Sequence, residues 1–127
     1  MTREELVRRA IGAVNERDVE GYLEFCTDDI ELHTPVAEVA GPHEGPDGIR
    51  RFFADIEDAG PDFRLELERV ELVGERVLAF LQVRATGRTS GIAMDLETAN
   101  VYEFDGDRIS RVRMYTDRAE ALEVAGA

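Results

Sequence analysis

Hydrophobic residues recur with a helical period in three segments of the first half of the chain, residues 6–14, 19–26 and 49–56. Thr2 and Glu5 form a capping box before the first segment, and Asp18 is placed to cap the second. The third segment ends near Gly60, and glycine commonly terminates helices. The pattern therefore predicts three short helices.

Short apolar runs and alternation with a period of two predict the strands. The first strand is expected over residues 30–34, before a loop at residues 35–48 whose three glycines and three prolines disfavour regular structure. Later strands are expected over residues 63–68, 77–85, 92–104 and 111–116, and a last helix over residues 117–124. We expect one α+β domain, residues 1–127, with helices on one face of a curved antiparallel sheet.

The charge balance limits the partners and the chemistry. The chain has 28 acidic and 15 basic residues, a net charge of -13, so we expect neither nucleic acid nor a membrane as partner. It contains no lysine, which excludes a Schiff base on a lysine and conventional PLP attachment. One cysteine and no signal-like or membrane-spanning segment favour a cytoplasmic protein.

The strand expected over residues 92–104 places an amide among apolar side chains. Its alternation puts Asn100 on the inward face. A buried amide without a partner costs about 1 to 3 kcal/mol, so a ligand, a water molecule, Thr34 or Thr98 should satisfy it. Tyr102 lies on the same face, either as a core aromatic residue or as a second polar group of the same network.

Several segments resemble the SnoaL-like branch of the NTF2-like superfamily. They are Val14–Gly21, Thr27–Glu31, Thr34–Pro35, Gly45–Phe53 and Phe104–Ile109. The resemblance covers nearly the whole chain and implies an NTF2-like (cystatin-like) cone, in which N-terminal helices pack on a strongly curved sheet that encloses a cavity. It also implies a homodimer and a small apolar, polyketide-like or steroid-like ligand.

The family includes ketosteroid isomerases, polyketide cyclases and epoxide hydrolases, together with proteins that only bind. The isomerase base position corresponds to Thr34, whose hydroxyl is no base near neutral pH, and the tyrosine donor position corresponds to Ala10. Asn100 occupies the remaining donor position. The acidic position on the last strand of the epoxide hydrolases corresponds to Met114, and residues 77–85 contain no Arg-x-Asp pair. Neither reaction is expected.

The strand pattern and the resemblance together predict a mostly apolar ligand cavity. Its expected residues are Leu32, Thr34, Leu81, Met94, Asn100, Tyr102 and Met114, with Tyr22 as either a ligand contact or a core residue. The candidate catalytic residues are His33, Asn100 and Tyr102. Alternation turns His33 away from the cavity if Thr34 points inward, unless a bulge before Pro35 reverses this.

The remaining reactive side chains give no recognised motif. His43 is expected to be solvated in the loop or to reach the cavity mouth, and Cys26 is expected on the second helix as a core residue rather than a nucleophile. Ser90 lies one place away from the nucleophile-elbow pattern. We expect no metal and no organic cofactor.

The last strand should expose arginines on the outer face of the sheet. Arg111, Arg113 and Tyr115 share that face, where acidic residues at positions 95, 97 and 103 could pair with them or with a second subunit. This arrangement favours a homodimer. The alternative places Arg113 and Asp117 inside the cavity as an ion pair.

The sequence leaves three functions open: an isomerase, cyclase or hydrolase acting on a hydrophobic ligand, a non-catalytic binding module, and a subunit that interacts through its sheet. Acid–base catalysis requires a titratable group in the cavity, whereas binding does not.

Overall fold

The computed structural model describes residues 1–34, 41–86 and 93–126. Its helices are α1 (Arg3–Glu16), α2 (Val19–Glu24), α4 (Gly45–Ala59) and α5 (Arg118–Gly126). Its strands are β1 (Cys26–His33), β2 (His43–Glu44), β3 (Arg64–Val73), β4 (Arg76–Thr86), β5 (Ala93–Asp105) and β6 (Arg108–Tyr115). No helix of the described residues is long and apolar enough to cross a membrane.

Side chains cap the first two helices as the sequence predicts. The hydroxyl of Thr2 accepts a hydrogen bond from the Glu5 N–H at 3.1 Å, and the carboxylate of Asp18 accepts one from the Gly21 N–H at 3.0 Å. These bonds satisfy amide groups that have no partner inside the helix. Arg17 ends α1 in the left-handed conformation and turns the chain toward α2.

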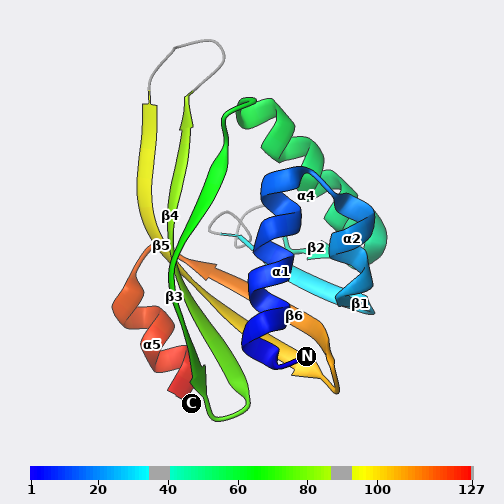
Figure 1. The fold of residues 1–127 in the computed structure, drawn as a ribbon, viewed down its shortest axis with the longest axis vertical. Helices are drawn as coiled ribbons and strands as arrows, with labels where there is room; N and C mark the ends of the chain where they lie inside the picture. Colours follow the sequence, from blue (N-terminus) through cyan, green and yellow to red (C-terminus); the bar gives the residue numbers. More distant parts are fainter. Residues whose placement is uncertain (35–40, 87–92, 127) are drawn as a thin grey trace.

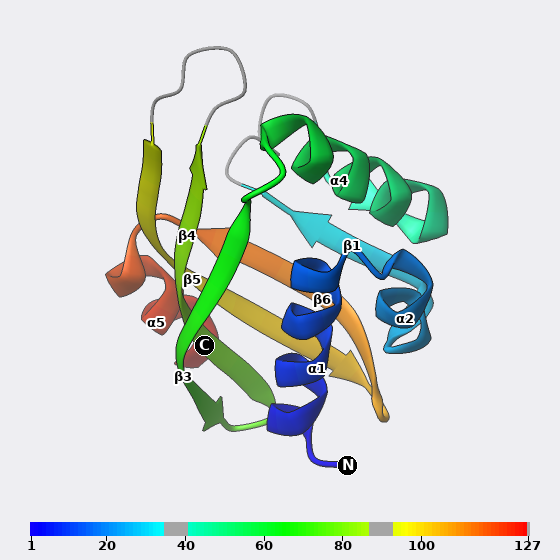
Figure 2. The same ribbon diagram turned by 45° about the horizontal axis from the view of Figure 1, so that its top comes forward.

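The strands form one curved sheet in the order β2-β1-β6-β5-β4-β3 (Figures 1 and 2). All neighbouring strands are antiparallel except β1 and β6, which are parallel. The first long strand and the last strand of the chain therefore lie side by side. This confirms the α+β, mostly antiparallel, NTF2-like architecture.

Helices cover both faces of the sheet, so the expectation of helices on one face is wrong. α1, α2 and α4 lie on the inner face, and α5 lies on the outer face (Figure 1). Beneath α5, Leu78 and Phe80 of β4 pack with Ala121 and Ala125 of the helix. β4 is apolar on both faces because both faces are covered.

Several segment boundaries also differ from the sequence prediction, among them the end of β3, which continues to Val73. β1 begins at Cys26, within the second predicted helix, because the Phe25 carbonyl accepts a hydrogen bond from Ile109 of β6 at 2.8 Å. Strand pairing thus overrides the local helical pattern. The expected loop contains β2 and the start of α4, in which Pro46 occupies the first turn, where its missing N–H is tolerated.

Candidate functional site

A cavity of about 220 Å³ lies between the inner face of the sheet and α4. Its described lining consists of six aliphatic or aromatic residues, one methionine, two threonines and one asparagine. They are Thr34, Phe52, Phe63, Leu65, Leu81, Val83, Leu96, Thr98, Asn100 and Met114. Leu96 is 40% exposed and marks a side on which the cavity reaches the surface.

The register of the sheet places the polar lining residues. Asn100 of β5 lies opposite Met114 of β6. His33 of β1 pairs with Arg113, which sets the next residue, Thr34, beside Met114. One row across three strands therefore carries an amide, a thioether and a hydroxyl.

The C-terminal end of α1 holds one wall of the cavity. Arg17 donates a hydrogen bond to the Phe63 carbonyl at 2.7 Å, and its guanidinium stands 5.7 Å from the centre of the Phe63 ring. The same guanidinium pairs with Glu57 of α4 at 3.2 Å. Arg17 thus ties the lining residue Phe63 to two helices.

Asn100 is a buried polar residue at the floor of the cavity. It is 3% exposed, and its amide donates a hydrogen bond to the Tyr102 hydroxyl at 3.4 Å. Burial raises the pKa of Tyr102 to about 12, against a smaller lowering effect of this hydrogen bond, so Tyr102 is neutral at physiological pH. The buried hydroxyl of Thr34 has no hydrogen-bond partner among the described residues.

None of the described lining residues carries a carboxyl, imidazole, thiol, phenol or basic group. The walls can therefore bury apolar surface and offer neutral hydrogen bonds. They offer no side chain that would accept or release a proton near neutral pH.

Residues 7–112 match the SnoaL-like domain family. The chain belongs to this family. A comparison with curated proteins found no match.

Solved structures support the fold assignment of this SnoaL-like domain. An uncharacterised cystatin-fold protein from Novosphingobium aromaticivorans is 29% identical, with a TM-score of 0.78, over 90% of this chain and 97% of that one. Bal32a, from a soil-derived mobile gene cassette, is 27% identical, with a TM-score of 0.79, over 87% and 86%. TerC, co-crystallised with polyporic acid, is 20% identical, with a TM-score of 0.77, over 97% of each chain.

The cavity brings together half of the residues selected from the sequence. Thr34, Leu81, Asn100 and Met114 line it. Leu32, Tyr22 and Tyr102 do not, because they are buried in the core shared by the sheet and the N-terminal helices. The side chain of Met94 lies outside the described residues.

The other six lining residues were not selected from the sequence. They are Phe52, Phe63, Leu65, Val83, Leu96 and Thr98. The family register that selected Leu81 also points Val83 inward, because the two residues are two positions apart on one strand. The alternation that selected Asn100 includes Leu96 and Thr98, and the alternation over residues 63–68 includes Phe63 and Leu65. Periodicity could therefore have indicated four of them, and the family register could have indicated Val83.

The two histidines lie outside the cavity lining. His33 is on the outer face, where its Nε2 lies 3.0 Å from the Glu31 carboxylate, so alternation along β1 continues to Thr34. The expectation that His43 is solvated is wrong, because its side chain is 16% exposed and lies in β2. Its ring packs edge-on against Phe52, a lining residue, at 6.0 Å between ring centres, and its Nε2 lies 3.4 Å from Asp55.

Cys26 is a core residue at the start of β1, not on the second helix. It is 2% exposed, and its thiol donates to the Tyr22 carbonyl at 3.4 Å. Burial raises the pKa of Cys26 to about 12, which disfavours the nucleophilic thiolate. Ser90 lies outside the described residues.

The outer face carries an ion-pair network. Arg111 lies 3.4 Å from Glu31 and 3.5 Å from Glu103, and Arg113 also lies 3.5 Å from Glu103. Arg113 is therefore outside the cavity lining, and the alternative in which it pairs with Asp117 inside the cavity is wrong. The described residues contain no group of three or more side chains placed to hold a metal ion.

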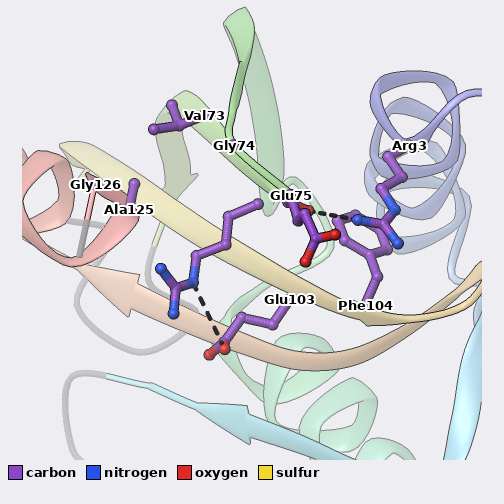
Figure 3. Close-up of a pocket in the computed structure, with 9 residues that line it drawn as sticks. Arg3, Val73, Gly74, Glu75, Glu103, Phe104, Ala125 and Gly126 are labelled. Atoms are coloured by element: carbon purple, nitrogen blue, oxygen red, sulfur yellow. Dashed lines mark hydrogen bonds and ion pairs between the residues drawn. The ribbon is translucent and has the colours of Figure 1, made fainter.

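A second hollow, of about 410 Å³, lies at the other end of the sheet between α1, the C-terminus of α5 and the β3–β4 turn (Figure 3). Arg3 donates to the carbonyls of Glu75 and Gly106 at 2.7 and 3.1 Å and lies 4.9 Å from the centre of the Phe104 ring. Arg3 thereby fastens α1 to two hairpin turns. These contacts give Arg3 a structural role, which is to hold α1 against the sheet.

Proposed function

We propose that this SnoaL-like domain binds a small, mostly apolar molecule in the cavity between the sheet and α4. The observation that carries the proposal is the composition of the lining, which combines an apolar wall with a buried amide and a buried hydroxyl. Ligand sites commonly combine apolar walls with a few polar groups that orient the bound molecule. The presence of polyporic acid in TerC, which has the same fold, supports a small-molecule ligand.

Among the functions left open, the lining favours binding over acid–base catalysis. Thr34 stands at the position of the isomerase base, and no described lining residue replaces the missing carboxylate. A cavity without a titratable side chain can hold and orient a ligand but has no side chain to move its protons.

The test is an NMR titration of the methyl groups of leucine, valine and methionine. The probes are acetophenone and α-methylstyrene, two uncharged molecules of nearly the same shape. Binding in the cavity should shift the methyl signals of Leu81, Val83 and Met114 in a saturable way. Signals from Leu78 and Val101, on the opposite face of the sheet, should move much less.

A matched pair of variants tests whether the methyl shifts come from binding in the cavity. Leu96→Trp fills the side of the cavity that reaches the surface and should weaken binding of both probes by about tenfold or more. Leu72→Trp makes the same change at a residue that is 53% exposed and does not line the cavity, and should leave binding unchanged. No saturable binding, or equal binding to both variants, would overturn the proposal.

We also propose a homodimer through the part of the outer face that α5 leaves uncovered. Glu31, Glu103, Arg111 and Arg113 form a network of both charge signs there. Such a surface can pair with a second copy of itself in a defined register, although each exposed ion pair contributes little stability.

A further inference from the structure

The volume of the cavity limits the size of its ligand. An engineered protein cavity of about 150 Å³ lined by apolar side chains holds one benzene ring, so about 220 Å³ corresponds to about nine non-hydrogen atoms. A single ring with a short substituent has this size. A tetracyclic molecule is more than twice as large and would leave much of its apolar surface in water.

The polar groups of the cavity indicate the kind of ligand atom they would meet. The Asn100 amide has two N–H groups, of which one donates to Tyr102. The Thr34 hydroxyl has no partner among the described residues. Both groups can donate a hydrogen bond to an oxygen atom, and the cost of leaving a buried polar group unpaired favours a ligand that supplies one.

The lining also disfavours ligands that carry a charge. An ionised group that enters an apolar cavity loses its hydration, and only an opposite charge or several hydrogen bonds can compensate. No described lining residue carries a charge. The nearby Tyr102 is also neutral near pH 7, and burial raises its pKa further, to about 12.

From these three properties we infer that the cavity takes an uncharged molecule of single-ring size with a carbonyl or hydroxyl oxygen, which bonds to Thr34 or Asn100. Small aryl ketones and phenols belong to this class. The inference rests on the proposed function, because it specifies the ligand of the same cavity. It excludes steroids, larger polycyclic molecules and carboxylates.

The test measures two ligands against three variants by calorimetry or NMR. Acetophenone carries the oxygen, and α-methylstyrene replaces that oxygen with a CH2 group. Thr34→Val removes the cavity hydroxyl with little change of shape, and Asn100→Leu removes the amide. Thr27→Val is the matched control, because the Thr27 hydroxyl is also buried on β1, with no partner in the described part of the chain, but lies outside the cavity lining.

Thr34→Val or Asn100→Leu should lower the affinity for acetophenone by about fivefold, the usual effect of one lost hydrogen bond. The variant that weakens acetophenone binding should not lower the affinity for α-methylstyrene. Thr27→Val should change the affinity for neither ligand. If Thr34→Val and Asn100→Leu each change the affinities for acetophenone and α-methylstyrene equally, the assignment of the ligand oxygen is wrong. The proposed function would still stand. Should Asn100→Leu fail to fold, the Thr34→Val comparison still decides whether Thr34 makes the bond.

Two further probes test charge and size on the wild-type protein. Benzoate, similar in shape to acetophenone but ionised at neutral pH, should bind at least about a hundredfold more weakly. Progesterone, an uncharged steroid ketone, should not shift the methyl signals of Leu81 and Met114. Binding of benzoate as tight as that of acetophenone would overturn the charge assignment, and saturable progesterone shifts would overturn the size limit. If neither acetophenone nor α-methylstyrene binds, the proposed function itself fails.

Discussion

The side-chain amide of Asn15 pairs with both backbone groups of Leu65. Asn15 donates to the Leu65 carbonyl at 2.9 Å and accepts from the Leu65 N–H at 2.8 Å. One side chain of α1 thus supplies the hydrogen bonds that a neighbouring strand would supply to β3, an edge strand of the sheet. Because Leu65 lines the cavity, this pair fixes the position of the wall that Arg17 also holds through Phe63.

Asn15→Ala should lower the free energy of unfolding by about 2 kcal/mol, because it leaves two part-buried backbone groups without their partner. Urea denaturation measures this change. Glu16→Ala, at the adjacent exposed position of α1, should have a much smaller effect. Equal losses in the two variants would show that the pair is not specifically stabilising.

The Cys26 thiol should be protected from modification in the folded protein. Burial raises its pKa to about 12, and the side chain is nearly inaccessible. At pH 8, a thiol reagent such as DTNB should react at least about tenfold more slowly with the folded protein than with the protein in concentrated urea. A fast reaction in native buffer would contradict the core position of Cys26.

The Glu31 carboxyl should make stability depend on acid pH. A hydrogen bond with His33, followed by interactions with Arg111, holds the pKa of Glu31 below its ordinary value. The ionised carboxylate therefore adds to the free energy of unfolding above the ordinary carboxyl pKa. This contribution is lost as the pH falls through the lowered pKa of Glu31. Between about pH 6 and pH 3, the free energy of unfolding should fall less in Glu31→Gln than in the wild-type protein. In Glu123→Gln, on α5, it should fall as much as in the wild type.

The protein should not isomerise a β,γ-unsaturated 3-ketosteroid. Thr34 supplies no base, and no described residue of the cavity lining supplies a carboxylate. An absorbance assay for the conjugated product should show no turnover above the buffer rate. Turnover comparable to that of a ketosteroid isomerase would contradict both this prediction and the preference for binding.

Sedimentation should show a dimer at micromolar concentration if the outer face is the interface. Arg113→Glu reverses one charge of the network with Glu103 and should shift the protein toward monomer. Arg8→Glu makes the same change at an exposed position of α1, on the other face of the sheet, and should not. A wild-type monomer whose state is insensitive to salt would contradict this interface.

Some of the site follows from sequence periodicity alone. Asn100 could be placed among buried residues because β5 is long and its alternation fixes one face, and the same register brings Leu96 and Thr98 to the cavity. Alternation over residues 63–68 puts Phe63 on an apolar face, but it does not show that this residue lines the cavity. Phe63 precedes β3, and its position at the cavity wall depends on the contact with Arg17, which no local pattern contains.

The positions of α5 and β2 show what a local pattern lacks. The buried residues of α5 are two alanines, which give little hydrophobic periodicity, and the informative signal was the two-sided apolar run of β4. β2 has only two residues, so it has no usable period. It forms through pairing with β1 and through a close approach of His43 to Gly48, where a Cβ atom would lie 2.7 Å from the His43 carbonyl carbon.

The parallel pairing of β1 with β6 has a consequence for biosynthesis. β1 emerges early from the ribosome, but apart from the two-residue β2 its strand partner is β6, near the end of the chain. Thr34 and Met114 cannot meet before β6 is synthesised, so the cavity cannot form on a nascent chain that ends before this strand. Contacts between such distant segments form slowly, because a long loop must close first. Until then β1 has no long strand partner and the sheet beneath the helices is incomplete, and we expect this interval to be the one in which aggregation competes most strongly with folding.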